Sequence, residues 1–144
     1  MELYAPKSVI LIRLLVGLVF FSEGIQKFLF PNDLGVGYFT VIGIPFPQIM
    51  ASFVGIVEII CGTLLIFGLA TRVATIPLLV DIATAIFVTK LPIYFHEGFW
   101  SMAHEARVNF CMLLSLLFIL AIGPGLLSID AYIARESHPY QANL

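Results

Sequence analysis

Four long apolar stretches limit what this chain can fold into. They cover roughly Val9–Phe30, Ile49–Ala70, Val73–Phe95 and Glu105–Ile122. Each reaches or approaches the length of about 20 residues that an α-helix needs to cross a bilayer. Apolar side chains make up 60% of the chain and charged ones 11%, and the mean hydropathy is +1.05. The sequence therefore predicts an all-α integral membrane four-helix bundle, forming a single domain over residues 1–144.

The segments between the spans predict how the helices are connected. Leu34–Pro47 is too apolar for an ordinary loop, too short to span, and rich in glycine and proline. It predicts a short interfacial or re-entrant helix, because irregular backbone at membrane depth must be covered by protein. The brief Gly68–Arg72 turn makes its two flanking spans an antiparallel hairpin. The third span is expected to end near Pro92, with Leu91–His104 as a more polar connector.

Basic residues predict the orientation of the chain. An even number of spans puts both termini on one side, and the first span, which has no small-residue cleavage site, is read as a retained helix. The basic residues assigned to the side of the termini are Lys7, Arg13, Arg72 and Arg135. Those assigned to the opposite side are Lys27, Lys90 and Arg107. This small bias favours a multi-pass protein of the cell inner membrane with both termini in the cytoplasm.

Three carboxylates lie inside the apolar runs: Glu23, Glu58 and Asp81. A charge at the bilayer centre costs about 3 kcal/mol or more, so such a residue is usually paired, turned to the bundle interior, or functional. Glu58 has only apolar neighbours in its own helix and must take a cation or an amide from another helix. It is the strongest single functional candidate in the sequence, although a purely structural hydrogen bond is an equal alternative.

Helical spacing of about 100° per residue places most interior polar groups on stripes that contain small residues. The stripe of the first span is Arg13, Gly17, Phe20, Gly24 and Lys27, with Glu23 at its edge. The stripes of the next two are Ala51, Gly55, Glu58 and Gly62, and then Ala74, Pro77, Asp81, Thr84 and Ala85. The last span offers Glu105, Asn109, Met112 and Leu116. Glycines on a stripe allow helices to approach closely, so these faces are expected to meet.

Depth along the helices separates two groups of charges. Arg13 and Asp81 are both assigned to the inner half, which predicts a structural ion pair between the first and third spans. Glu23 and Lys27 are spaced to neutralise each other within one helix. Lys90, like Arg107, is interpreted as an interface anchor whose ammonium or guanidinium group extends to water.

The outer-half polar residues form a candidate ligand site. Its members are Glu23, Lys27, Glu58, Glu105 and Asn109. The third span offers Thr84, Ala85 and Val88 as a smooth wall at the same level. A flat ring can lie on the smooth side and form hydrogen bonds on the other. The alternative is a closed charge network that only locks the helices together.

Other chemistries find less support. Cys61 and Cys111 form no C-x-x-C pair and are interpreted as small buried apolar residues. His96, Glu97, His104 and Glu105 lack a recognised zinc-ligand spacing, so no metal site is predicted. A net charge of −2 without a basic tract predicts no nucleic-acid partner.

The pattern resembles the DoxX family of small four-helix membrane proteins. The residues that carry the resemblance are Arg13, Gly17, Phe20, Gly24, Lys27, Gly43-Ile44-Pro45, Gly55, Glu58, Gly62, Gly68, Thr71-Arg72, Glu105 and the block Gly123–Asp130. The resemblance implies a bacterial or archaeal membrane protein. Members include membrane subunits of thiosulfate:quinone oxidoreductase, a mycobacterial subunit linked to superoxide dismutase and a sulfurtransferase, and proteins tied to quinone or catechol stress. The long connector Leu91–His104 departs from the commoner family pattern, which leaves partner surfaces on that side unassigned.

Two functional hypotheses follow. In the first, the protein is a redox-linked membrane subunit that binds a quinone, or a similar small aromatic molecule, between its helices. The chain shows no flavin, haem or iron–sulfur motif and no intrinsic cofactor is predicted, so a redox partner protein supplies the electrons. In the second, it is a non-catalytic anchor or assembly subunit whose buried charges set helix packing and partner choice. A transporter is a weaker third reading, because four helices require a homo-oligomer to enclose a path.

Overall fold

The computed structural model describes residues 6–137, and in that range every regular element is helical. The elements are α1 (Val9–Leu29), α2 (Val36–Val41), α3 (Pro47–Phe67), α4 (Thr71–Ala85), the π-helical segment η1 (Ile86–Lys90), α5 (Leu91–Glu97), α6 (Phe99–Ile122) and α7 (Ile129–Ser137). Four runs are long and apolar enough to span a membrane: α1, α3, the continuous stretch Thr71–Glu97, and α6. The predicted all-α membrane fold is confirmed.

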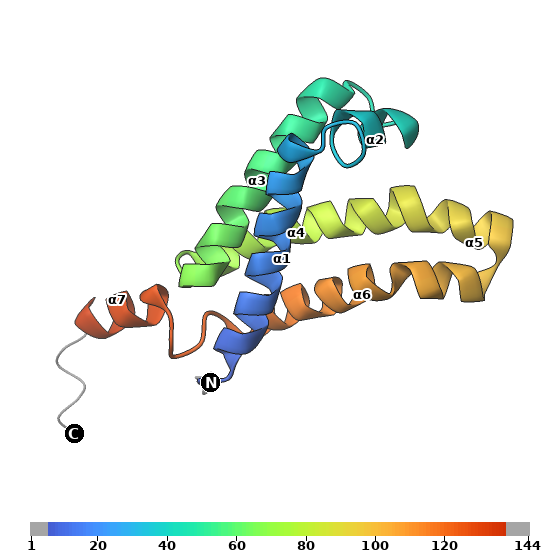
Figure 1. Ribbon diagram of the computed structural model, residues 1–144. Helices are drawn as coiled ribbons and strands as arrows, with labels where there is room; N and C mark the ends of the chain where they lie inside the picture. The colour runs from blue at the N-terminus through green and yellow to red at the C-terminus, as the bar shows by residue number, and fades with distance from the viewer. Residues whose placement is uncertain (1–5, 138–144) are drawn as a thin grey trace.

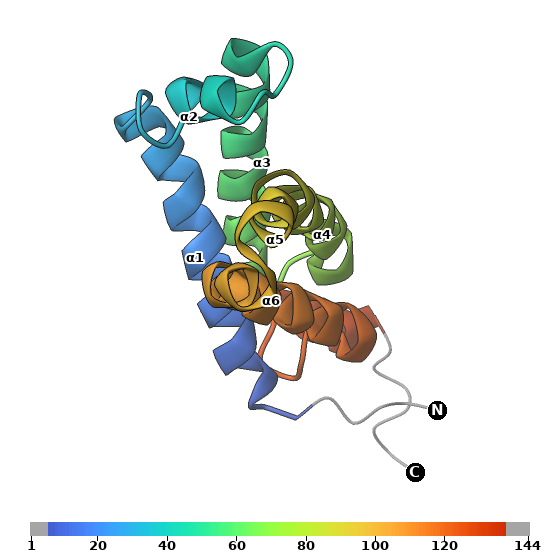
Figure 2. The same cartoon turned by 90° about the vertical axis from the view of Figure 1, so that its right-hand side faces the viewer.

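The four spans form two antiparallel pairs that cross each other (Figure 1). One pair is α1 with α3. The other is the α4–η1–α5 run with α6, and it is seen nearly end-on in Figure 2. Because the pairs cross, they share a core around Val16 and Phe20 of α1 and around Cys61 and Leu65 of α3, in the half of α3 that leads into α4. The helix α5 and the adjoining end of α6 extend away from α1 and α3 (Figures 1 and 2).

Glycines bring α1 and α3 into backbone contact. A Cβ atom on Gly24 would lie 2.6 Å from the carbonyl oxygen of Gly55. One on Gly62 would lie 2.8 Å from the carbonyl oxygen of Gly17. Four glycines therefore meet in two layers along this pair, which confirms that the glycine-bearing stripes of these two spans face each other.

The core draws side chains from all four spans. Its fully buried members include Val16 of α1, Leu65 of α3, Leu78 of α4, and Leu116 and Ile119 of α6. Cys61 belongs to this core, as predicted. The prediction was wrong for Cys111, which is exposed on α6, because this position points away from the other helices.

The boundaries at the α5–α6 end differ from the prediction. Helix continues through Pro92 to Glu97, and α6 begins at Phe99, six residues before the predicted Glu105, so the expected connector Leu91–His104 is almost entirely helical. Pro92 lies in the first turn of α5, where a missing N–H is tolerated, and the wider π turn of η1 precedes it. Only Gly98, with φ of +89°, separates α5 from α6.

The opposite end is held together by the segment between α6 and α7. Arg13 is only 2% exposed, and its guanidinium donates hydrogen bonds to the carbonyl oxygens of Pro124 and, at 2.6 Å, of Leu127. Asp130 accepts hydrogen bonds from the N–H groups of Ala70 and Thr71 at 2.7 and 2.9 Å, which caps the start of α4. The Gly123–Asp130 block thus joins α1, α4 and the α3–α4 turn.

This arrangement overturns the predicted Arg13–Asp81 ion pair. Both terminal nitrogens of the buried Arg13 guanidinium donate to backbone carbonyls instead. Asp81 lies ten residues beyond Thr71, which is about 15 Å along α4 at about 1.5 Å per residue, and so belongs to a different level of the protein. Gly125 packs against Val9, so the start of α1 and the segment after α6 lie at the same end of the protein; the predicted placement of both termini on one side falls on residues outside the described range.

Candidate functional site

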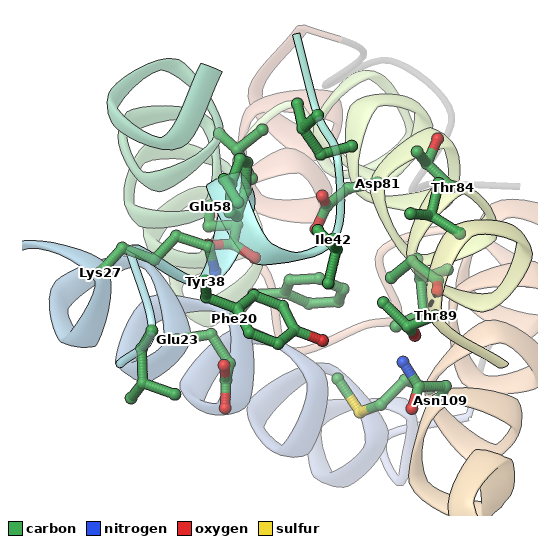
Figure 3. A pocket seen from close by; sticks show the side chains of 18 of the residues that line it. Phe20, Glu23, Lys27, Tyr38, Ile42, Glu58, Asp81, Thr84, Thr89 and Asn109 are labelled. Carbon is green, nitrogen blue, oxygen red and sulfur yellow. Dashed lines mark hydrogen bonds and ion pairs between the residues drawn. The ribbon is translucent and has the colours of Figure 1, made fainter. Parts of the chain in front are cut away.

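A cavity of about 500 Å³ lies where the two helix pairs cross (Figure 3). Side chains from α1, α2, α3, α4, η1 and α6 line it. Its polar lining consists of Glu23, Lys27, Tyr38, Glu58, Asp81, Thr84, Thr89, Lys90 and Asn109. Its apolar lining includes Val19, Phe20, Phe39, Ile42, Ile82, Ala85, Val88 and Met112. A cavity of this volume with a few polar groups on apolar walls is typical of small-molecule sites.

Lys27 and Glu58 form an ion pair across the α1–α3 contact. The Nζ atom of Lys27 lies 2.6 Å from Oε2 of Glu58, and the two side chains are only 11% and 5% exposed. The expectation that Glu58 takes a cation from another helix is confirmed. The predicted pairing of Glu23 with Lys27 is wrong. Glu23 is exposed at the rim of the cavity, and its carboxylate points away from the Lys27–Glu58 pair (Figure 3). The close α1–α3 contact gives Lys27 a less exposed partner than its own helix offers.

Asp81 completes this group from α4. Its carboxyl neighbours that of Glu58 at the cavity (Figure 3), and the charge of Lys27 acts on both carboxyls. We call these three residues the Lys27–Glu58–Asp81 cluster. The sequence interpretation placed Asp81 elsewhere, yet a signal was present: Glu58 and Asp81 are equally far in sequence from the Leu69-Ala70 turn, so the α3–α4 hairpin brings them to one level.

The wall formed by η1 and the later part of α4 faces the Lys27–Glu58 pair (Figure 3). Thr84, Ala85 and Val88 line the cavity as the sequence indicated, and Thr89 and Lys90 of the π segment join them. The hydroxyl of Thr84 donates to the carbonyl of Val80 at 2.7 Å, and that of Thr89 to the carbonyl of Ala85 at 2.6 Å. These hydroxyl oxygens therefore keep only acceptor capacity for a ligand.

The predictions for Lys90 and Glu105 were wrong. Lys90, interpreted as an interface anchor, lines the cavity, because the π turn rotates the helix at this point. Glu105 does not line the cavity and is exposed, whereas Asn109 one turn later does line it. The reason is that the end of α6 bearing Glu105 packs on α5, away from α1 and α3 (Figure 1). Arg107 is exposed and donates to the carbonyl of His104 within its own helix.

The short helix α2 covers one face of the cavity. Tyr38, Phe39 and Ile42 line it from this side, and Figure 3 shows the Tyr38 hydroxyl directed into the space. A Cβ atom on Gly35 would collide with the carbonyl of Lys27, so this glycine lets the chain fold back tightly after α1. The predicted short helix between the first two spans is therefore present, and it contributes Tyr38, which the sequence reading missed.

Within residues 6–137, no group of three or more His, Cys, Asp or Glu residues is placed to hold a metal ion. The site thus combines the Lys27–Glu58–Asp81 cluster with Glu23, Lys90 and neutral donors and acceptors around an apolar space.

These features define the class: a multi-pass α-helical membrane protein with a polar cluster beside a cavity between its helices. The DoxX family model matches residues 8–91, so the chain belongs to the DoxX family. The matched region contains Lys27, Glu58 and Asp81, whereas Asn109 and the Gly123–Asp130 block lie outside it.

Two relatives extend the comparison over most of the chain. An uncharacterized membrane protein of Mycobacterium tuberculosis, Rv3486, is 54% identical over 138 residues, which is 92% of this chain and 85% of that protein. A Bacillus subtilis protein named "Putative oxidoreductase CatD" is 28% identical over 126 residues, covering 88% of this chain and 87% of its own length. No solved structure matches the chain.

Proposed function

We propose that this protein is a membrane subunit of a redox-linked complex and binds a quinone, or a similar small aromatic molecule, in the cavity between its helices. The observation that supports this most is the cavity itself, which combines about 500 Å³ of space between apolar walls with polar groups on different sides, Glu58 and Asp81 on one and Asn109 on another (Figure 3). A ring with two oxygens at opposite ends is the kind of ligand that fits such a cavity.

The lining offers partners for both oxygens of such a ring. Near one end, Glu58 and Asp81 present carboxyl oxygens. At the other, the amide of Asn109 can donate or accept, and the hydroxyl of Tyr38 can do the same. Phe20 and Met112 supply apolar contacts between these ends. A carbonyl oxygen needs a donor and a phenolic hydroxyl also needs an acceptor, and the site provides both.

The family relationship supports the redox link, since one relative carries the name of an oxidoreductase. Electrons enter from a partner protein in this proposal. The complex lies in the cell inner membrane with both described ends of the chain on the cytoplasmic side, because Lys7, Arg72 and Arg135 all fall at that end.

The proposal is tested by what the protein carries out of its native membrane. Purified wild-type protein, extracted with its lipids and examined by mass spectrometry, is expected to contain close to one quinone per chain. Ala85→Trp fills the cavity without altering a charge and should abolish this binding. Ala83→Trp places the same side chain on an exposed position of α4 outside the cavity and should retain it.

A second function, that of a non-catalytic anchor or assembly subunit, is favoured by one observation. The Lys27–Glu58 ion pair joins α1 to α3 beside the glycine contacts, and so stabilises helix packing with or without a ligand. Wild-type protein that lacks quinone but retains a stable partner protein would support the anchor and overturn the ligand site.

A further inference from the structure

The Lys27–Glu58–Asp81 cluster contains more acidic groups than basic ones. One ammonium, from α1, faces two carboxyls, from α3 and α4. The ammonium contacts Glu58 at 2.6 Å, and Glu58 in turn neighbours Asp81. Fully ionised, the cluster would carry one net negative charge where water is scarce, since the Lys27 and Glu58 side chains are only 11% and 5% exposed.

Hydrogen bonding, like charge, disfavours a cluster in which both carboxyls are ionised. An ionised carboxylate only accepts hydrogen bonds, so two of them side by side have no donor between them. If one carboxyl holds a proton, its O–H donates to the other, and the repulsion between like charges is removed. Two carboxyls that share a site therefore retain a single proton more readily than either does alone.

The other groups around the cluster do not supply the second positive charge that two ionised carboxylates would need. Glu23 of α1 lies exposed at the rim and points away (Figure 3). Lys90 of η1 also lines the cavity, but it lies nine residues, about 13 Å along the helix, beyond Asp81, and among residues 6–137 it forms no salt bridge. The elements α2 and α6 contribute Tyr38 and Asn109, which are uncharged. Lys27 is thus the cation that contacts Glu58, and its single charge balances one of the two carboxyls.

We propose that Glu58 and Asp81 share one proton at neutral pH and, with Lys27, form a net-neutral acid–base group in the wall of the cavity. Its role toward a ligand rests on the function proposed above. The protonated carboxyl donates a hydrogen bond to a carbonyl oxygen, and the ionised one accepts a hydrogen bond from a hydroxyl. The same pair therefore serves both a quinone and a hydroquinone, and a neutral cluster selects neutral ligands over anionic ones.

Infrared spectroscopy of the ligand-free protein measures the proton directly. In an ester-free detergent at neutral pH, the carbonyl stretch of protonated carboxylic acids should correspond to one group per chain and should shift in D₂O. Glu58→Gln and Asp81→Asn should each abolish this band, because the remaining carboxylate is balanced by Lys27. Lys27→Met should double it, because neither carboxyl then has a cation. Glu105→Gln, an exposed carboxylate outside the cavity, is the control and should leave the band unchanged.

The wild-type spectrum alone can overturn the proposal, whatever the variants do. A band for no group, or for two groups, contradicts the shared proton. So does a band that persists in either amide variant, or one that stays at a single group in a folded Lys27→Met protein.

The role toward a ligand is tested separately with a short-chain ubiquinone analogue. Its binding should shift the protonated-carboxyl band in the wild type and leave it unshifted in Ala85→Trp. Binding without a shift would overturn the hydrogen-bonding role of the pair. A correct proton count with no binding would overturn the proposed function while the shared proton stands, so the two failures are distinguishable.

Discussion

The close contact between α1 and α3 predicts that two facing glycines respond differently to the same substitution. Gly24 and Gly55 lie opposite each other, so Gly24→Ala and Gly55→Ala each add one methyl group to the same contact. Both changes gain about 1 kcal/mol of helix propensity, which cancels in the comparison. The difference in stability between the variants therefore reports the steric environment alone.

That environment differs in what the new methyl group meets. On Gly24 it would lie 2.6 Å from the carbonyl oxygen of Gly55 and 3.0 Å from the backbone nitrogen of Ile59, and neither atom can move without moving α3. On Gly55 its nearest contact, at 2.8 Å, is the far edge of the Phe28 ring. That ring is 47% exposed and can rotate away.

Forcing an extra methyl group into a tight backbone contact costs about 1–3 kcal/mol, whereas displacing an exposed ring costs little. Gly24→Ala should therefore be less stable than Gly55→Ala by about 1–3 kcal/mol. At about 2–4 °C per kcal/mol for a chain of this size, the difference in Tm is a few degrees or more. Thermal unfolding in one detergent, followed by circular dichroism, measures it.

Ala83→Val serves as the control, because it adds methyl groups at an exposed position of α4 and should leave Tm near the wild-type value. Equal Tm values for Gly24→Ala and Gly55→Ala, or a lower one for Gly55→Ala, would refute the backbone contact between α1 and α3 on which the placement of Lys27 beside Glu58 depends.

Three further predictions concern the end of the protein where α1, α4 and α7 meet. Arg13→Leu leaves the carbonyls of Pro124 and Leu127 without their donor and should cost about 1–3 kcal/mol for each, measured as a fall in Tm; an unchanged Tm would contradict this role. Asp130→Ala removes the cap of α4 and should cost about 0.5–2 kcal/mol, while Asp130→Asn, which keeps an acceptor, should cost less; equal losses would argue against capping. In a Cys111→Ser background, cysteines at positions 7 and 135 should be shielded from an impermeant thiol reagent in intact cells and react after lysis; labelling from outside would reverse the proposed orientation.

Sequence alone was enough for features that depend on one helix at a time. The number of spans follows from the lengths of the apolar runs, because a bilayer requires about 20 apolar residues of helix wherever they occur. The inward faces of α1 and α3 follow from glycine and charge spacing, because the angle between residues of one helix is set by its geometry. The need of Glu58 for a partner elsewhere follows from the apolar residues around it.

The helix boundaries at the α5–α6 end were harder to predict from the sequence. The aromatic and polar residues between Leu91 and His104 are typical of a connector, but the same composition suits helices near a membrane interface, where Tyr, Phe and Trp are exposed. The part of α6 that bears Glu105 packs on α5, away from the expected site, while Asn109 one turn later lines it.

Partner choice between helices was decided only by the tertiary structure. Lys27 lies within reach of Glu23 in its own helix and of Glu58 in α3, and the close glycine contacts make the second the buried alternative. Asp81 comes beside Glu58 because α4 follows α3 after a tight turn and packs against it, while Arg13 finds carbonyls from a segment more than a hundred residues later in the chain. Helical periodicity gives a direction around one axis; the distance between two side chains on different helices depends on where those axes cross, and long-range packing sets that crossing.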